Sequence, residues 1–361
     1  MNGKRWAALG IAVALFLFSV ITSIASSTIF SSDEDEMGFV DSWLGMSEEM
    51  FSEEIIEEGN INQKIAVLDI NGTISSSGTT SLLSSDEYNH ESFLKRLEMV
   101  KEDDSIVGVV ISVNSPGGGV SESAEIYDKI KELQEETEKP VYVSMGSMAA
   151  SGGYYVSALA DKIFATEETL TGSLGVIMQS INYEELADNL GIDTVTIKSG
   201  PYKDIMAADR EMTDEEQAIL QSMIDNSYNK FVRIIAEGRG MSEEEVRKLA
   251  DGRIYDGVQA KEVGLIDDFG YLDDVTDAMK NDLQMKNASV VRYTDSISLS
   301  SLFSASTQKL LGDHIDLSSI LNVVSQPNSP KLMYLYGESG GIEITDNKAA
   351  HQIEDKKRGL T

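Results

Sequence analysis

The sequence predicts an α/β fold with a largely parallel sheet. Apolar runs of strand length alternate with stretches whose apolar residues recur at helical spacing. The short runs are apolar throughout, as expected for strands that helices cover on both faces. The predicted strands span residues 65–70, 106–113, 141–143, 163–165 and 194–197. This alternation is typical of parallel strands joined by helices.

The predicted helices separate these strands and then dominate the later part of the domain. They span residues 91–99, 121–137, 154–160 and 213–236, and a further helix begins after 242. Thr213 with Glu216 and Ser242 with Glu245 have the spacing of capping boxes, in which each side chain bonds the other residue's backbone N–H. Gly238 and Gly240 are expected to end the helix that Thr213 begins.

The composition excludes several classes of function. The chain has 361 residues, enough for one large domain or two smaller ones, and a formal net charge of −32. Such an excess of acidic residues argues against nucleic-acid binding, because phosphate contacts need clustered Lys and Arg. There is no Cys, which excludes disulfides, thiolate metal sites and a cysteine nucleophile. We expect no metal and no cofactor.

The N-terminal segment has the features of a membrane anchor. Lys4 and Arg5 precede an uncharged, mostly apolar run over 6–30, long enough to cross a hydrocarbon core of about 30 Å. The basic flank predicts a cytoplasmic N-terminus, a single pass through the lipid bilayer of the cell membrane and an extracytoplasmic main domain. The alternative is a cleaved signal peptide with a site near 23–25, although the apolar run is long for one.

Changes in composition predict four regions. They are the anchor at 1–31, an acidic linker at 32–62, a folded domain at 63–295 and a C-terminal extension with a flexible tail at 296–361.

A turn of small residues at 146–155 is the first candidate for a reactive site. It follows a predicted strand and leads into a predicted helix, so Ser151 would lie at the helix N-terminus. Free backbone N–H groups and the helix dipole favour negative charge there. This arrangement suits a serine nucleophile beside an oxyanion hole. The alternative is simple packing at a strand–helix corner.

A glycine-rich segment at 114–119 is the second candidate, because it directly follows the predicted strand 106–113. Successive glycines let the backbone approach a ligand closely. One interpretation is half of an oxyanion hole, formed by the N–H of Gly118; the other is a plain tight turn. A phosphate-binding loop would need a Gly-Lys-Ser/Thr ending, which is absent.

A serine nucleophile in this chain would need a base other than histidine. The chain has three histidines, none at the end of a predicted strand: His90, His314 and His351. A lysine can act as base if its surroundings lower its pKa. Lys198 and Lys203 both follow the predicted strand 194–197, and small and apolar residues surround Lys203. Asp204 beside it also allows an ordinary salt bridge.

Four segments together resemble the signal peptide peptidase A family, membrane-anchored Ser/Lys proteases of the Clp protease and crotonase superfamily. These segments are the Pro-Gly-Gly turn at 116–118 and residues 146–155, 198–204 and 251–267. The resemblance runs from about residue 65 to about residue 291, and the length matches the half-length bacterial form. It implies a crotonase/Clp-protease-like superhelix of stacked ββα units behind one N-terminal transmembrane helix.

The resemblance also implies a role for five residues. Ser151 corresponds to the nucleophile, and Lys203, which follows an aromatic position, corresponds to the general base. Ser173 matches a serine that bonds the lysine amine; the alternative is a helix cap or a turn hydroxyl. The N–H groups of Gly118 and Gly152 would form the oxyanion hole.

The implied activity is that of a serine endopeptidase that degrades signal-peptide remnants and similar hydrophobic peptides, bound as extended strands. In half-length relatives Ser151 and Lys203 should come from neighbouring protomers of a ring-shaped homo-oligomer, for which an octamer is one size. We also expect the apolar segment 332–336 to occupy the enzyme's own groove and be trimmed. The alternatives are a crotonase-like acyl-CoA enzyme, which would need acidic catalytic groups, and a membrane scaffold in which Ser151 is dispensable.

Overall fold

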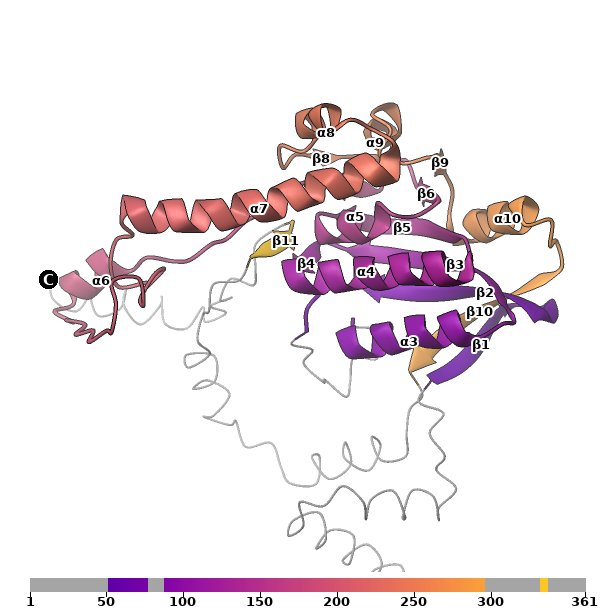
Figure 1. Cartoon of the computed structure of the whole chain (residues 1–361), viewed down its shortest axis with the longest axis horizontal. Helices are drawn as coiled ribbons and strands as arrows, with labels where there is room; N and C mark the ends of the chain where they lie inside the picture. Colours follow the sequence, from indigo (N-terminus) through magenta and orange to yellow (C-terminus); the bar gives the residue numbers. More distant parts are fainter. Residues whose placement is uncertain (1–50, 77–87, 296–331, 337–361) are drawn as a thin grey trace, which may run out of the picture. The chain divides into compact units, whose positions relative to one another are not determined.

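A nine-stranded, mostly parallel sheet forms the body of the described chain. The structure is a computed structural model that describes residues 51–76, 88–295 and 332–336 (Figure 1). Seven strands follow the order β1-β10-β2-β3-β5-β6-β9, and β7 and β8 extend the sheet beside β5. The strands are β1 Phe51–Glu57, β2 Asn60–Asn71, β3 Ile106–Ser115, β5 Val141–Ala150, β6 Lys162–Ala165, β7 Leu170–Gly172, β8 Ile254–Tyr255, β9 Asp268–Phe269 and β10 Ala288–Asp295.

Parallel pairing joins the central strands β2, β3, β5 and β6, which confirms the predicted α/β class. Antiparallel pairs occur between β1 and β10 and between β7 and β8. The apolar runs of the central strands are buried on both faces, as their composition predicts. The carboxyl ends of β3 and β5 lie next to each other, because Ser115 pairs with Ala149. These ends position the candidate site.

Helices cover the sheet on both faces (Figure 1). Helices α3, α4 and α5 pack on one face, where their apolar residues join one core cluster with the sheet. Helix α10 packs on the other face against a second cluster that includes Ile65, Val67 and Val110. The helices are α3 His90–Glu102, α4 Val120–Thr137, α5 Gly152–Ser157, α6 Glu184–Asn189, α7 Asp214–Arg239, α8 Glu243–Leu249, α9 Gly257–Glu262 and α10 Leu272–Asp282.

The two predicted capping boxes are confirmed. Thr213 and Glu216 cap α7 reciprocally, and Ser242 and Glu245 cap α8. Of the two glycines predicted to end α7, Gly240 does so in the left-handed conformation, whereas Gly238 lies inside the helix.

A second, small sheet pairs two segments that lie far apart in the sequence. Strand β4, Gly117–Gly119, pairs antiparallel with β11, Met333–Leu335. The segment 332–336 therefore lies against the glycine-rich segment, where the sequence analysis expects the substrate groove.

The predicted strand at 194–197 is wrong. These residues belong to an arm, residues 178–213, that contains α6 and leads into α7 (Figure 1). Val195 is 85% exposed and Ile197 is 97% exposed, and no described strand pairs with them. Their β-branched composition favours a strand, but a strand also needs a partner that supplies the ladder hydrogen bonds.

The predicted membrane anchor, 1–31, lies outside the described residues. Within the described ranges, no helix combines the length and the apolar character that a membrane span requires. The sheet includes residues of the predicted acidic linker, because β1 begins at Phe51. Of the predicted C-terminal extension, the structure describes residues 332–336.

Candidate active site

Ser151 occupies a strained turn between β5 and α5. Its φ of 53° and ψ of −111° lie outside the regions that residues with a side chain ordinarily adopt. The turn is held at both ends: Ser151 N donates to Gly172 O at 2.8 Å, and Tyr155 N donates to Ser151 O at 2.8 Å. The side chain is buried, and Oγ has no hydrogen-bond partner among the described residues. A fixed backbone with an unengaged hydroxyl is the geometry of an available nucleophile.

Strand β4 lies between two other segments of the chain. On one edge, Ile74 N donates to Gly117 O at 2.9 Å and Gly119 N donates to Ile74 O at 2.8 Å. On the other edge lies β11, with Tyr334 opposite Gly118. The segment at Ile74 therefore fixes β4 and leaves its second edge for a peptide strand.

The segment 332–336 fills this position as an extended strand with partners on both sides. Against β4, Val120 N donates to Leu332 O at 3.3 Å and Tyr336 N donates to Pro116 O at 2.8 Å. On the opposite side, Met333 exchanges two backbone hydrogen bonds of 3.0 Å with Ile177. Such two-sided backbone pairing binds a peptide without regard to most of its side chains.

The carbonyl oxygen of Tyr334 lies at the predicted oxyanion hole. A methyl group added to Gly117 would be 2.0 Å from Tyr334 O and 2.6 Å from Gly152 N. The positive φ of Gly117, 98°, also favours glycine there. Because Gly118 is the ladder partner of Tyr334, this carbonyl lies beside both predicted donors. The structure thus brings Gly118 and Gly152 together at one peptide carbonyl, with Ser151 directly before Gly152 in the chain.

An aromatic pocket receives the side chain of Tyr334. Its ring stacks on Tyr155 with centroids 4.8 Å apart and packs against Phe231 at 4.8 Å. The hydroxyl donates to Ser227 O at 3.0 Å. Burial raises the pKa of Tyr334, so the hydroxyl stays a neutral donor. The pocket was not predicted, because α5 and α7, which form it, are far apart in the sequence.

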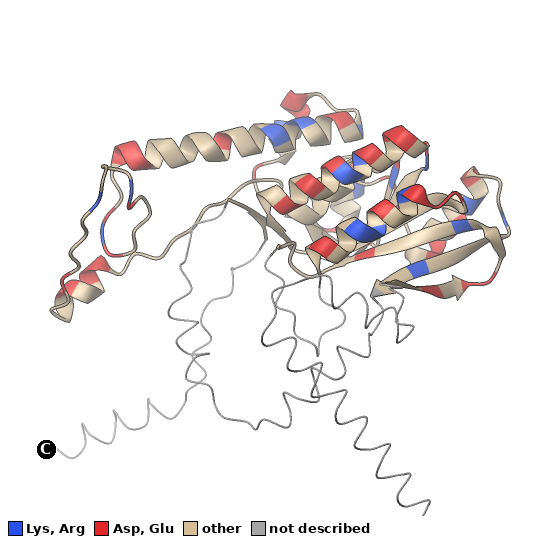
Figure 2. Cartoon of the chain, turned by 60° about the horizontal axis from the view of Figure 1, so that its bottom comes forward, with Lys and Arg blue, Asp and Glu red and all other residues tan. Residues whose placement is uncertain are grey.

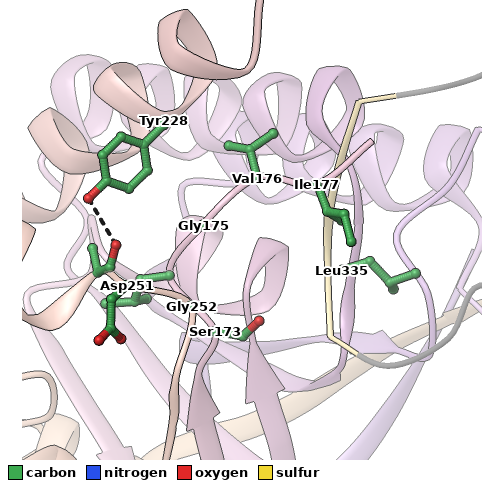
Figure 3. Close-up of a pocket in the computed structure, with 10 residues that line it drawn as sticks. Ser173, Gly175, Val176, Ile177, Tyr228, Asp251, Gly252 and Leu335 are labelled. Atoms are coloured by element: carbon green, nitrogen blue, oxygen red, sulfur yellow. Dashed lines mark hydrogen bonds between the residues drawn. The ribbon is translucent and has the colours of Figure 1, made fainter. Parts of the chain in front are cut away.

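A hollow of about 360 Å³ lies next to Leu335 of β11 (Figure 3). The segment 332–336, which contains β11, is called the tail strand. Ser173, Tyr228, Gly252 and Leu335 are among its lining residues. Ser173 has a positive φ of 49°, and its N–H donates to Arg253 O at 2.7 Å, which holds the residue at the edge of the hollow. The space is open next to the position of Leu335.

Lys203 lies on the arm, in the segment that joins α6 to α7. This segment lies beyond the N-terminal end of α7, away from α5 and β4 (Figure 1). Its side chain is exposed. The structure therefore does not bring Lys203 to Ser151 within one chain.

Asp204 is bound by other cations. Lys198 pairs with Asp204 at 2.6 Å, and Arg210 pairs with it at 2.9 Å. The hydrogen bonds from Arg210 and Lys198 hold the pKa of Asp204 well below its usual range. The predicted salt bridge to Asp204 thus engages Lys198, and Lys203 is the lysine of this segment outside that ion pair.

The histidines do not form a triad with Ser151 in the described residues. His90 begins α3, where its ring lies 2.6 Å from Tyr88 Oη and 3.0 Å from Glu125 Oε2. His314 and His351 lie outside the described residues.

The ion pairs of the arm predict a specific pH dependence of stability. The hydrogen bond from Arg210 lowers the pKa of Glu216 from 4.5 to about 2. Because the folded state disfavours protonation, this pair stabilises fully above pH 4.5 and loses its effect as the pH falls toward about 2. The melting temperature of Glu216→Gln should be below that of wild type at neutral pH. This difference in melting temperature should vanish in acid. Glu237→Gln, an exposed acid of α7 outside this network, is the control; a gap that persists in acid would contradict the prediction.

Comparison with known proteins identifies the family. The model of Peptidase family S49 matches residues 133–286, and the model of Clp protease matches residues 64–171. The Enterococcus faecium protein named "Putative signal peptide peptidase SppA" is 40% identical over 349 residues, covering 93% of this chain and 99% of that protein. The chain belongs to peptidase family S49. Protease 4 of Haemophilus influenzae is 31% identical over 301 residues, 78% of this chain and 48% of that protein.

The S49 membership makes the chain a serine endopeptidase with a Clp-protease-like α/β fold. It supports the peptidase interpretation over the acyl-CoA and scaffold alternatives. Among solved structures, a ClpP1 mutant from Listeria monocytogenes is similar at 21% identity with a TM-score of 0.38, over 59% of this chain and 94% of that one.

Proposed function

We propose that this S49 peptidase cleaves extended hydrophobic peptides, signal-peptide remnants among them, with a Ser151/Lys203 dyad. The observation that carries the proposal is the tail strand: its Tyr334 carbonyl lies at Gly118 and Gly152 N. Ser151, which directly precedes Gly152, has a buried hydroxyl without a hydrogen-bond partner among the described residues. A substrate strand in the same position would present its scissile carbonyl to Ser151.

The proposed reaction begins when neutral Lys203 takes the proton of the Ser151 hydroxyl. Oγ then attacks the carbonyl carbon, and the negative oxygen is held by the N–H groups of Gly118 and Gly152. Each such donor contributes about 2.7–4 kcal/mol in an acyl-transfer enzyme. The C–N bond breaks as the lysine returns the proton to the leaving amine. Water, activated by the same lysine, then hydrolyses the acyl-enzyme.

The arm supports the proposal that Lys203 reaches Ser151 from a neighbouring copy. It carries large apolar side chains that no part of the described chain covers: Ile181 69%, Leu186 61%, Leu190 66%, Val195 85% and Ile197 97% exposed. In Figure 2 the first half of α7, beyond its acidic first turn, also presents few charges. Large apolar side chains gathered in one exposed segment favour an interface between proteins.

We propose that the arm packs on the next protomer of a homo-oligomeric ring, an octamer being one closed size. The hollow beside Ser173 lies next to the tail strand and is open, so it could admit the Lys203 amine with Ser173 as its hydrogen-bond partner. The predicted anchor, 1–31, would hold the ring on the outer face of the cell membrane, where remnants of signal peptides are left.

Replacing Ser151 with alanine tests the proposed function. We expect hydrolysis of a Leu/Ala-rich peptide to fall on the order of 10⁴-fold or more, because no other group replaces the nucleophile. Ser157→Ala is the matched control: this serine, on α5, is also buried, but its hydroxyl donates to Gly153 O at 2.6 Å. The proposal is wrong if Ser151→Ala hydrolyses the peptide as well as the control does.

A further inference from the structure

Ser123, in the first turn of α4, has a buried hydroxyl with no partner. Its side chain is 0% exposed, and Oγ forms no hydrogen bond with any described residue. Buried polar groups nearly always form hydrogen bonds, so a buried hydroxyl without one is unusual and often has a functional role. Of the four buried side-chain atoms without a partner in the described chain, three lie at this site: Ser123 Oγ, Ser151 Oγ and the Tyr155 hydroxyl of the aromatic pocket.

The Ser123 hydroxyl lies against Gly152, one of the two residues of the proposed oxyanion hole. A methyl group in place of the Gly152 hydrogen would be 2.7 Å from Ser123 Oγ and 3.0 Å from Gly118 N. Both atoms thus line the same side of Gly152. Helix α4 begins directly after β4, so its first turn, which carries Ser123, also faces this region with its positive dipole end.

We propose that Ser123 is a further residue of the oxyanion hole, whose hydroxyl dipole turns toward the negative charge that develops on the substrate carbonyl oxygen. No hydrogen bond holds the hydroxyl hydrogen in the resting site, so its rotation breaks no contact. The charge exists in the transition state and not in the bound substrate, so the hydroxyl should act on kcat rather than on KM. This role rests on the proposed function of Ser151, Gly118 and Gly152.

The unbonded Ser123 hydroxyl also predicts the direction in which the melting temperature changes when it is removed. An unbonded hydroxyl in a packed interior costs folding stability, and its removal should therefore stabilise the protein. A residue kept for catalysis at the expense of stability gives opposite changes in activity and melting temperature on replacement. A hydroxyl that merely fills space would raise the melting temperature without changing kcat.

The experiment compares Ser123→Ala, Ser157→Ala and Ser151→Ala in the full chain with a Leu/Ala-rich peptide. For Ser123→Ala we expect kcat to fall roughly tenfold, less than for loss of a direct donor, with KM unchanged. Its melting temperature should rise by roughly 2–4 °C. Ser157→Ala, which loses the bond to Gly153 O, should melt lower and keep its kcat.

Two outcomes for Ser123→Ala would overturn the inference. One is a kcat within about twofold of wild type, below what an oxyanion-hole group contributes. The other is a lower kcat together with a lower melting temperature, which would assign Ser123 to support of the fold. If Ser151→Ala stays active, the proposed function itself fails. If Ser151→Ala is inactive and Ser123→Ala is normal, only this inference fails.

Discussion

Subunits with Ser151→Ala and subunits with Lys203→Ala are each expected to be inactive, and their co-assembly is expected to restore peptide hydrolysis. In one chain the arm carries Lys203 away from α5 and β4, so the proposed Ser151/Lys203 site would take its two residues from two copies (Figure 1). In a randomly mixed ring, about a quarter of the interfaces would join an intact serine to an intact lysine. The measurement is hydrolysis by co-expressed, differently tagged subunits purified through both tags.

The control for this experiment replaces one partner with the double variant Ser151→Ala/Lys203→Ala. This subunit supplies neither group, so its assemblies with Ser151→Ala should stay inactive. Doubly tagged assemblies of the two single variants that show no hydrolysis would mean that each site lies within one chain. The arm would then have to fold back toward its own Ser151.

The second large effect is expected at the chain's own C-terminus. Wild-type protein should be cleaved between Tyr334 and Leu335, because the Tyr334 carbonyl lies at Gly118 and Gly152 N. Ser151→Ala protein should keep its full length. Intact-mass spectrometry of both proteins gives the readout. Removal of residues 335–361 from the Ser151→Ala protein as well would point to another protease.

Variants of Tyr334 test why this bond is chosen. Tyr334→Asp places a charge against the rings of Tyr155 and Phe231, and should abolish cleavage. Tyr334→Phe keeps the ring but loses the bond to Ser227 O, and should be cleaved more slowly. Tyr336→Phe is the matched control outside the pocket. Equal cleavage of all three variants would contradict selection through the Tyr334 side chain.

The local parts of the site could be predicted from the sequence. The small residues at 146–155 predict the strand–turn–helix that holds Ser151, and the glycines at 116–119 predict a close backbone approach. Both depend on neighbouring residues alone. The predicted self-occupied groove also has its physical counterpart, since β11 pairs with β4.

The aromatic pocket and the exposure of residues 194–197 could not be predicted from neighbouring residues, because they depend on contacts between distant parts of the chain or with another molecule. The aromatic pocket combines Tyr155 of α5 with Phe231 of α7, and no local pattern links them. The apolar residues at 194–197 resemble a buried strand, but they are exposed because one protomer offers them no partner. A single sequence shows that such apolar residues favour burial. It does not show whether they are buried by the same chain or by another one.

The three glycines of β4 are each constrained by a different neighbour. A side chain on Gly117 would meet the peptide carbonyl of Tyr334 at 2.0 Å, and one on Gly118 would meet the Ile74 carbonyl at 1.9 Å. The nearest atoms to a side chain on Gly119 would be those at the end of the Glu122 side chain, which can move. A side chain is therefore blocked at 117 by the peptide strand on β4, blocked at 118 by the Ile74 segment and best tolerated at 119. Three identical residues in a row thus differ in how well each would tolerate a side chain.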